Sequence, residues 1–273
     1  MPQTTLTPFN ETKKAQQFYR NIWGGDDLHV GLYKKPGLSL HEAGRKTTQR
    51  MLKLVPRIKK SSKALVLQSG FGTAARYLAR EKKCKVFCLN DNQLQNAYNQ
   101  GRIDELGLEK VINVEKGGVE YMPYEPNFFD FVLAQDSFSI TASKRQLFRA
   151  IHRVLQPEGR MVFTALMRAE KLQPKAKKLI EKLPVEELIS QKQYEKDARR
   201  GFFQQVYAQD LSRYLPVHFS KVLTTLEQKY DDLVVRGGQK LVDKRLKTYQ
   251  LFQQLAEQEQ LRWGIFVFQK LNA

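Results

Sequence analysis

The stretch "ALVLQSGFGTAARYLAR", residues 64–80, decides how the chain folds. A short apolar run leads into a turn that contains Gly70 and Gly72, and apolar residues at helical spacing follow the turn. A strand, a glycine turn and a helix in this order commonly hold a nucleotide-type cofactor, because glycine lets the backbone approach the ligand closely. The stretch predicts a cofactor loop, although two glycines alone do not establish one.

The alternation continues on the C-terminal side of this turn. Helical spacing is found at 73–81, 92–107 and 143–156, between β-rich runs that predict strands at 64–68, 85–89, 111–115, 129–134 and 160–166. Strands that alternate with amphipathic helices indicate a parallel sheet covered by helices on both faces.

The flanking segments complete an α/β fold. Residues 167–204 are charged and helical, which predicts a helical insertion or lid. A strand is expected at 219–228, a long helix over 243–260 and a last strand at 261–270, in keeping with a seven-stranded, mostly parallel sheet whose last strand is antiparallel. Residues 1–50 are mainly helical around a glycine- and aromatic-rich centre. We expect them to form an N-terminal helical cap on an α/β domain at 51–273.

The charge of the chain is strongly basic, with a formal net charge of +18. The excess is +8 over residues 1–60, +3 over 61–164 and +7 over 165–273. Such a field favours an anionic partner, either an acidic protein, a membrane surface or nucleic acid, although a generally solvated basic surface is the alternative. We expect one continuous basic surface made by Lys13, Lys14, Lys34, Lys35, Lys59 and Lys60 of the cap side and by Lys171, Lys175, Lys177, Lys178, Arg199 and Arg200 of the insertion side.

The apolar runs and cysteines suggest an intracellular protein. No run approaches the roughly 20 apolar residues of a membrane helix, and the first residues lack the apolar core of a secretion signal, so we expect a cytoplasmic protein. Cys84 and Cys88 share one face of a predicted strand, where their Cα atoms would lie roughly 13 Å apart. That separation excludes a disulfide and indicates two buried apolar residues. No metal site is predicted.

Several segments together resemble one enzyme family. They are "FYRNIWGGDDLHVGLY" (18–33), "GTAARYLAR" (72–80), "CKVFCLN" (84–90), "FFDFVLAQDSF" (128–138), "HRVLQPEGRMVFT" (152–164) and "LRWGIFVFQK" (261–270). They are similar to the glycine/sarcosine/dimethylglycine N-methyltransferases, which are class I S-adenosylmethionine-dependent enzymes. The resemblance implies a Rossmann-like methyltransferase fold, a small amine as substrate, and S-adenosylmethionine bound by Gly70, Gly72, Asn90, Asp91 and Gln135.

The chain departs from the family pattern at polar positions. Val66 stands where the family has an acid, Gln68 where it has the first glycine of the turn, Lys116 where it has the aspartate beside the adenine amine, and Ile140 where it has a histidine. Two or three lost hydrogen bonds of about 1–3 kcal/mol each would weaken binding by on the order of a hundredfold or more. The main prediction is therefore a methyltransferase-fold protein with weak or absent cofactor binding that has become a binding protein. The alternative is an active methyltransferase for a small amine, with compensating contacts from Gln68, Lys116 or Glu115.

The resemblance also marks candidate residues on the substrate side, although no catalytic residue is predicted. Tyr19, Trp23, His29 and Tyr33 could line a site for an alkylated amine, because aromatic faces attract such cations. They could equally pack the cap onto the sheet. Asp136 of "QDSF" completes the set. A nucleic-acid-directed function rests on charge alone, because the lysines are not interleaved with aromatic residues as in single-strand binders.

Overall fold

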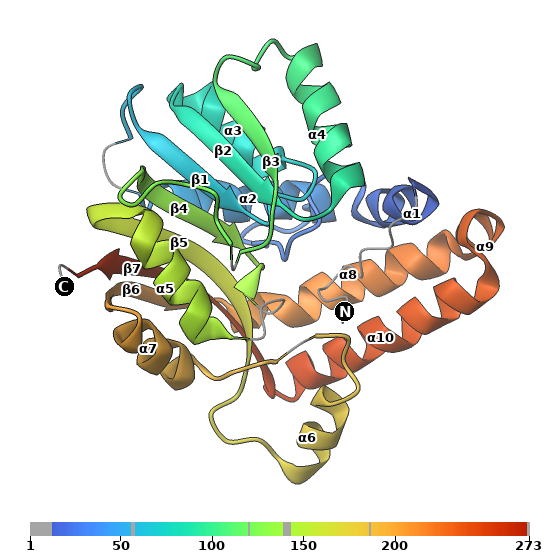
Figure 1. The fold of residues 1–273 in the computed structure, drawn as a ribbon. Helices are drawn as coiled ribbons and strands as arrows, with labels where there is room; N and C mark the ends of the chain where they lie inside the picture. Colours follow the sequence, from blue (N-terminus) through green and yellow to red (C-terminus); the bar gives the residue numbers. More distant parts are fainter. Residues whose placement is uncertain (1–12, 56–57, 120, 139–142, 186, 272–273) are drawn as a thin grey trace.

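A computed structural model describes residues 13–55, 58–119, 121–138, 143–185 and 187–271 of the chain. Seven strands form one sheet in the order β3-β2-β1-β4-β5-β7-β6, with helices on both faces (Figure 1). The strands are β1 (Lys63–Leu67), β2 (Lys85–Asn90), β3 (Ile112–Lys116), β4 (Phe129–Gln135), β5 (Leu155–Arg168), β6 (Phe203–Asp210) and β7 (Leu261–Lys270).

The pairing within the sheet confirms the predicted class of fold. Strands β1 to β5 pair in parallel, and β7 runs antiparallel to both of its neighbours, β5 and β6. From β1 the chain continues to β2 and β3 on one side of the sheet, and from β4 it continues to β5 on the other side. The direction of the strand order therefore reverses between β1 and β4. In open α/β sheets the ligand sits at this switch point, beyond the carboxyl ends of the strands.

The helices connect the strands and extend the cap. They are α1 (Lys13–Trp23), α2 (Leu40–Leu52), α3 (Thr73–Lys82), α4 (Gln93–Glu105), α5 (Lys144–Val154), α6 (Pro174–Ile180), α7 (Gln191–Arg200), α8 (Leu215–Gln228), α9 (Tyr230–Gly237) and α10 (Gln239–Glu257), with a short 3-10 helix η2 (Ser212–Tyr214) before α8. Helix α2 crosses residue 50, the predicted boundary between the cap and the α/β domain. The predicted insertion contains α6 and α7.

The alternating side chains of β1 enter two separate apolar layers. Ala64 and Val66 pack in a core with residues of α3, α8 and α10, whereas Leu65 and Leu67 pack with residues of α5 and α7. Both faces of the strand are therefore buried, which explains why its sequence is continuously apolar rather than alternating. Cys84 and Cys88 lie buried as free thiols in the first of these layers.

One predicted strand is wrong. Residues 219–228 belong to α8, and the sixth strand lies earlier, at Phe203–Asp210. In α8, Pro216 stands in the first turn, and the buried residues include Phe219, Val222 and Leu226, which recur at helical spacing. In β6, buried or half-buried residues alternate with exposed ones along the strand, which is the period of a strand.

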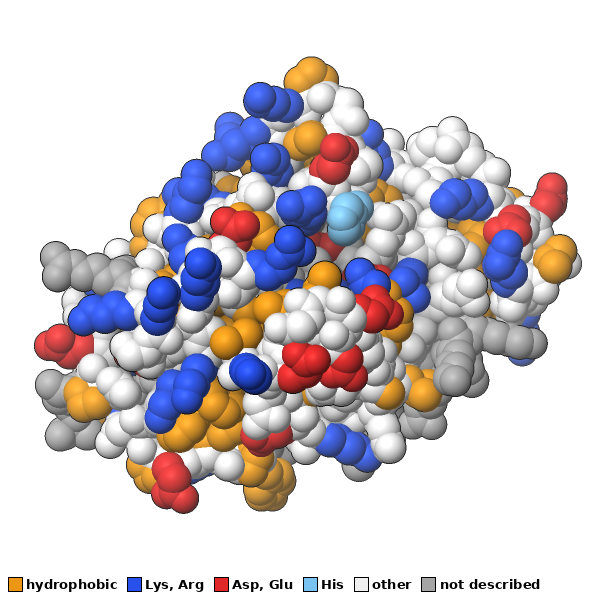
Figure 2. Space-filling model, turned by 90° about the horizontal axis from the view of Figure 1, so that it is seen from above, with side chains coloured by type: hydrophobic (Ala, Val, Ile, Leu, Met, Phe, Trp, Pro, Cys, Tyr) orange, Lys and Arg blue, Asp and Glu red, His pale blue; other side chains and the backbone are white. Residues whose placement is uncertain are grey.

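The predicted basic surface is divided between the two ends of the sheet. Lys59 and Lys60 precede β1, and Arg199 and Arg200 precede β6, at the amino ends of these parallel strands. The lysines of α6 instead follow the carboxyl end of β5. The side chains of Lys13 and Lys14 lie outside the described residues. Figure 2 shows Lys and Arg side chains spread over one side of its face, with Asp and Glu beside them.

None of the helices in the described ranges combines the length and the apolar character that crossing a bilayer requires.

Candidate functional site

The glycine turn after β1 has the backbone of a cofactor loop. Gln68, Gly70 and Gly72 all adopt positive φ angles, of 48°, 54° and 79°. A Cβ atom at Gly72 would lie 1.8 Å from Oδ1 of Asn99, so only glycine fits there, whereas a Cβ at Gly70 would meet no atom within 4 Å. The turn is thus open at Gly70 and packed at Gly72. Gln68 adopts the left-handed conformation at a cost of about 1–3 kcal/mol.

A buried arginine fastens this turn to the cap. Arg76 of α3 donates from Nη1 to the carbonyl of Phe71 at 2.5 Å and to Oδ1 of Asn99 at 2.7 Å. Its Nη2 lies 3.3 Å from Oδ2 of Asp26, whose Oδ1 accepts a 2.7 Å hydrogen bond from Nε of Arg20 in α1. The cap, α3 and α4 therefore hold the turn from three sides.

The end of β2 carries two predicted cofactor residues with different roles. Asn90 is buried, and its Nδ2 donates to Oε1 of Gln95 at 3.1 Å and to Oδ1 of Asn96 at 3.0 Å. The backbone carbonyl of Asn90 accepts from the side-chain Nδ2 of Asn96 at 2.9 Å. The Asn90 side chain shapes the loop that precedes α4. Asp91 is exposed, so its carboxylate is accessible at the carboxyl edge of the sheet.

Two buried polar atoms without partners border the same edge. Gln135, at the end of β4, accepts a 2.8 Å hydrogen bond from the Thr48 hydroxyl through Oε1, but its Nε2 has no partner among the described residues. The Thr73 hydroxyl at the start of α3 is likewise buried and unpaired within the described ranges. Buried polar atoms almost always have partners, so both atoms are suited to contact a bound polar molecule. The donors at this edge fit a nucleoside cofactor.

Asp136 connects three distant segments. Its Oδ1 accepts hydrogen bonds from the Trp263 indole at 2.9 Å and the Thr164 hydroxyl at 2.8 Å, and its Oδ2 accepts one from the backbone N–H of Val30 at 3.0 Å. Nδ1 of His29 lies 3.9 Å from Oδ2. The carboxylate is 5% exposed, so it holds the cap segment against β5 and β7.

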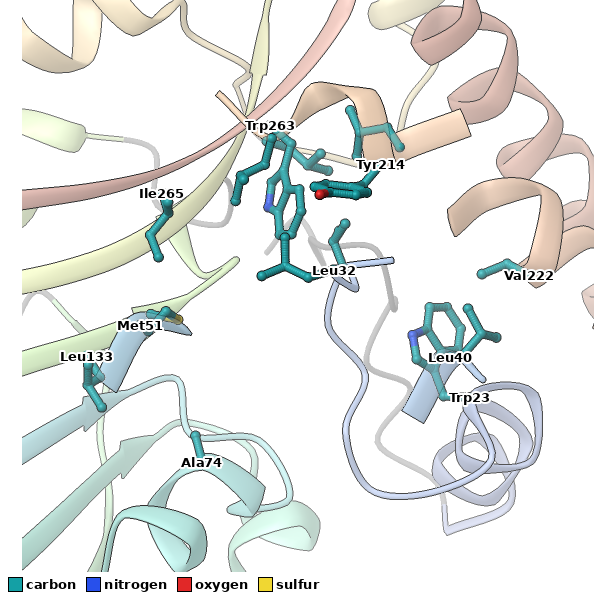
Figure 3. Close-up of a cluster of buried hydrophobic side chains, with 14 of the residues drawn as sticks. Trp23, Leu32, Leu40, Met51, Ala74, Leu133, Tyr214, Val222, Trp263 and Ile265 are labelled. Atoms are coloured by element: carbon teal, nitrogen blue, oxygen red, sulfur yellow. The ribbon is translucent and has the colours of Figure 1, made fainter. Parts of the chain in front are cut away.

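The aromatic residues predicted on the substrate side divide into two groups. Trp23 is buried beside His218 and Tyr249, with ring centroids 6.3 and 5.8 Å apart, and Tyr19 is also buried. Figure 3 shows Trp23 beside Leu40, away from Trp263. These two aromatics pack the cap. His29 and Tyr33 are only partly buried and lie on the segment that Asp136 anchors.

Tyr33 has a partner that sequence reasoning missed. Its hydroxyl lies 2.9 Å from Nδ1 of His218 in α8. His218 is fully buried, and burial lowers its pKa to about 3, so the imidazole is neutral at physiological pH. The signal in the sequence is weak, because His218 is a single histidine on an apolar helix face.

Asp27 is a second missed residue. It is 1% exposed, and neither carboxylate oxygen has a hydrogen bond of good geometry within the described residues. Burial raises the pKa of Asp27, and its electrostatic interactions with His29 and His41 oppose this increase. The unusual Gly-Gly-Asp-Asp segment was the available signal, but it does not show which aspartate is buried.

Val66 and Lys116, which depart from the family pattern, have different environments. Val66 is 4% exposed and stands in register with Cys88 and Leu133 inside the core. Lys116 is exposed, and its Nζ lies 3.5 Å from Oε1 of Gln93. Ile140 lies outside the described residues. Across the part of the chain that the structure describes, no three His, Cys, Asp or Glu side chains form a group able to hold a metal ion.

Comparisons of the sequence place the chain among known proteins. Residues 65–163 match the family model described as "Methyltransferase domain". The chain is 35% identical to the glycine/sarcosine/dimethylglycine N-methyltransferase of Actinopolyspora halophila, over 96% of this chain and 46% of that protein. It therefore spans about half the length of this relative. It is 28% identical to the sarcosine/dimethylglycine N-methyltransferase of Halorhodospira halochloris, over 97% of this chain and 96% of that protein.

Comparison of structures agrees with the sequence relationship. The crystal structure of a putative sarcosine dimethylglycine methyltransferase from Galdieria sulphuraria superposes with a TM-score of 0.86 and 27% sequence identity. The match covers 94% of this chain and 98% of the other. The cap and the insertion are therefore shared along with the sheet.

Proposed function

We propose, from the premise that this chain belongs to the class I S-adenosylmethionine-dependent methyltransferases and is related to the glycine/sarcosine/dimethylglycine N-methyltransferases, that it transfers a methyl group from S-adenosylmethionine to the nitrogen of a small amine. This is the alternative that the sequence left beside a decayed cofactor site. The family relationship supports the reaction type, and the relatives' names support the amine class.

One observation carries the proposal. The turn at 68–72 keeps its open, left-handed backbone, and unpaired buried polar atoms of Thr73 and Gln135 stand next to it. Gln135 ends β4 next to β1, and the register of these strands, continued by two residues from Val66 and Leu133, brings it level with Gln68. The unpaired atoms of Thr73 and Gln135 support a retained ligand site, because a buried polar atom without a partner costs about 1–3 kcal/mol and a bound cofactor would supply the partner.

We assign the following roles to the residues at this edge. Backbone groups of the turn and the Gln135 amide would hold the amino-acid end of the cofactor, and the exposed Asp91 carboxylate would accept from ribose hydroxyls. When bound, the cofactor would supply an electrophilic methyl group on its sulfonium sulfur; the amine lone pair would form the new C–N bond as the C–S bond breaks, with S-adenosylhomocysteine as the leaving group. The amine must reach the site in its neutral form. His29, on the cap segment near Asp136, is the imidazole placed to take the ammonium proton.

Apart from His29, the cap contributes by position rather than by chemistry. Asp136 ties Val30 to Trp263, so the segment that carries His29 and Tyr33 stays over the carboxyl ends of the strands. Holding the two reactants in line and excluding water is the main contribution that a protein makes to this type of transfer. Because the Asp136 carboxylate is already occupied by three donors, we assign it a positioning role.

Two measurements on the purified protein test the proposal. Isothermal titration with S-adenosylhomocysteine and S-adenosylmethionine should show saturable binding in the micromolar range, and Gln135→Leu should weaken it about tenfold, a loss typical of one polar contact. Gln254→Leu, at an exposed position of α10, is the matched control. Incubation with S-adenosylmethionine and glycine, sarcosine or dimethylglycine should give methylated product by mass spectrometry.

The outcomes separate the two parts of the proposal. Absence of cofactor binding at millimolar concentration would support the decayed-site interpretation instead. Cofactor binding without product from any of the three amines would leave the cofactor assignment intact and show that the amine class is wrong.

A further inference from the structure

A surface pocket of about 350 Å³ lies where the cap meets the start of α8. It opens between the loop that follows Tyr33 and the first two turns of α8, so it uses neither the glycine turn nor the ends of β1 and β2. Its volume falls within the usual range of small-molecule sites. The methyl-transfer assignment above leaves this pocket without a role.

Aromatic and aliphatic side chains line the pocket, and hydrogen bonds hold two of these side chains, Tyr33 and Tyr214, in place. The Tyr33 hydroxyl is held by Nδ1 of the buried His218 at 2.9 Å, and the Tyr214 hydroxyl accepts a 2.9 Å hydrogen bond from Nη2 of Arg213. Tyr214 is 7% exposed, whereas the neighbouring Val217 is 44% exposed. A flat apolar group therefore has rigid surfaces to pack against, and covering Val217 would remove an exposed hydrophobic side chain from water.

The charged side chains that line the pocket are all cations, and they have no acidic partner within the described ranges. Lys35, Arg213 and Lys221 border the pocket, and no acidic residue lines it. Within the described ranges none of these three cations takes part in a salt bridge, and the nearby Asp210 is paired with Arg262. Arg213 donates to the neutral hydroxyl of Tyr214, and its guanidinium carbon lies 4.9 Å from the centroid of the same ring, so within the described ranges it has an aromatic neighbour but no acidic partner. Three uncompensated cations around an apolar floor attract an anion that carries an apolar body.

We propose that this pocket binds a small molecule that joins a carboxylate or phosphate monoester to a flat apolar group. The anion faces Lys35 and Lys221 at the rim, with Arg213 beside it, and the apolar group lies against Tyr33, Tyr214 and Val217. The site is separate from the methyl-transfer edge. Its two possible anions share one recognition chemistry, and the experiment distinguishes them.

Titration with four simple probes tests the site. Phenyl phosphate and benzoate supply the two anions on an aromatic body, inorganic phosphate lacks the body, and benzyl alcohol lacks the charge. By NMR titration of the full chain at low ionic strength, we expect phenyl phosphate or benzoate to bind saturably and at least tenfold more tightly than the other two probes. Whichever of phenyl phosphate and benzoate binds more tightly identifies the anion. Equal binding of benzyl alcohol would overturn the proposal.

Two variants locate the binding. The double substitution Lys35→Gln and Lys221→Gln should weaken the preferred probe at least tenfold, while Lys244→Gln, an exposed lysine of α10 outside the pocket, should leave it unchanged. If the double variant melts earlier than the parent, the exposed Lys35→Gln alone provides the comparison. Unchanged affinity in the lysine variants, or loss of the probe when S-adenosylhomocysteine is added, would show that the probe binds elsewhere and overturn the assignment. These outcomes do not depend on whether the chain methylates an amine.

Discussion

The indole Nε1 of Trp263 donates a 2.9 Å hydrogen bond to Oδ1 of Asp136, from a position 127 residues further along the chain. The second oxygen of the same carboxylate accepts from Val30, 106 residues earlier. One buried group therefore joins the cap to the last strand across the candidate site.

Asp136→Asn tests this connection with a minimal change. The remaining carbonyl oxygen can still accept from Trp263 and Thr164, but the new amide presents a donor to the N–H of Val30. We expect the free energy of unfolding to fall by about 1–3 kcal/mol and hydrogen exchange at the Val30 amide to accelerate. Asp232→Asn, an exposed carboxylate paired only with Arg236, is the control and should change little. An unchanged Val30 exchange rate would contradict the role.

Gln68→Gly should improve both stability and cofactor affinity. It removes a side chain at the turn and relieves a left-handed conformation that costs about 1–3 kcal/mol. Glu158→Gly is the matched control, because Glu158 has a φ angle of 60° but lies near the amino end of β5, at the opposite end of the sheet from the turn, so it should gain similar stability with no change in affinity. Titration with S-adenosylmethionine and urea unfolding measure the two effects, and an equal affinity gain in both variants would show that the turn is not involved.

The other polar departures should behave differently in the same assay. Val66→Asp and Lys116→Asp, added to Gln68→Gly, restore the family's acids and should increase affinity further. Because Val66 is packed in the core, the aspartate should also lower the free energy of unfolding by about 1–3 kcal/mol. Lys116 is exposed, so its replacement should leave stability nearly unchanged. A triple variant that binds no better than Gln68→Gly would contradict the prediction that these acids matter.

His218 should make the protein sensitive to acid. Its pKa is about 3 in the folded chain against 6.5 as its ordinary value, so the unfolded chain binds the proton first as pH falls. The contribution of this group to stability is present above pH 6.5 and is lost progressively toward pH 3. Between pH 7 and 5 the loss amounts to about 2 kcal/mol. His218→Gln, which can still bond Tyr33, should flatten the slope measured by urea unfolding; an unaltered slope would rule out His218 as its source.

Asp27 should lower the free energy of unfolding as pH rises, whereas His218 lowers it as pH falls. Burial raises its pKa, so the folded chain holds this proton more tightly than the unfolded chain. Its stabilising contribution is complete below the ordinary carboxyl value of about 4 and is lost as pH rises through the raised value. Relative to Asp27→Asn, the parent should therefore lose stability from pH 4 to 7. The comparison of the two unfolding free energies at each pH measures this, and a gain by the parent would contradict it.

The strands of the sheet could be predicted because a short window of sequence is enough to indicate each of them. Each parallel strand is a β-rich apolar run between turn residues, and the runs at 64–68, 85–89 and 129–134 agree with β1, β2 and β4 within one residue. The failure at α8 also has a local cause, since Val222, Thr224 and Thr225 give a helix β-branched residues that favour strands. Packing against α10 decides the outcome, and packing is not visible in a short window.

The candidate site was predicted only where topology determines it. Residues at the ends of β2 and β4 could be named in advance, because carboxyl ends of parallel strands meet at one edge. The burial of Asp27 against Gly44, and the pairing of Tyr33 with His218 across 185 residues, depend on how the cap settles on α2 and α8. No periodicity in the sequence encodes such contacts. The positions of the basic residues could not be predicted for the same reason, because charge counts do not say at which end of the sheet a residue lies.

The convergence of Val30, Asp136 and Trp263 has a consequence for the newly made chain. Translation proceeds from the N-terminus, so the glycine turn and the Asp136 carboxylate leave the ribosome long before Trp263 does. Until β7 inserts between β5 and β6, the indole is missing from its place on the carboxylate, and β5 and β6 have no strand to join them. A nascent chain therefore holds the cap through Arg76, Asp26 and Val30, and the contact from the last strand is added only after Trp263 has left the ribosome.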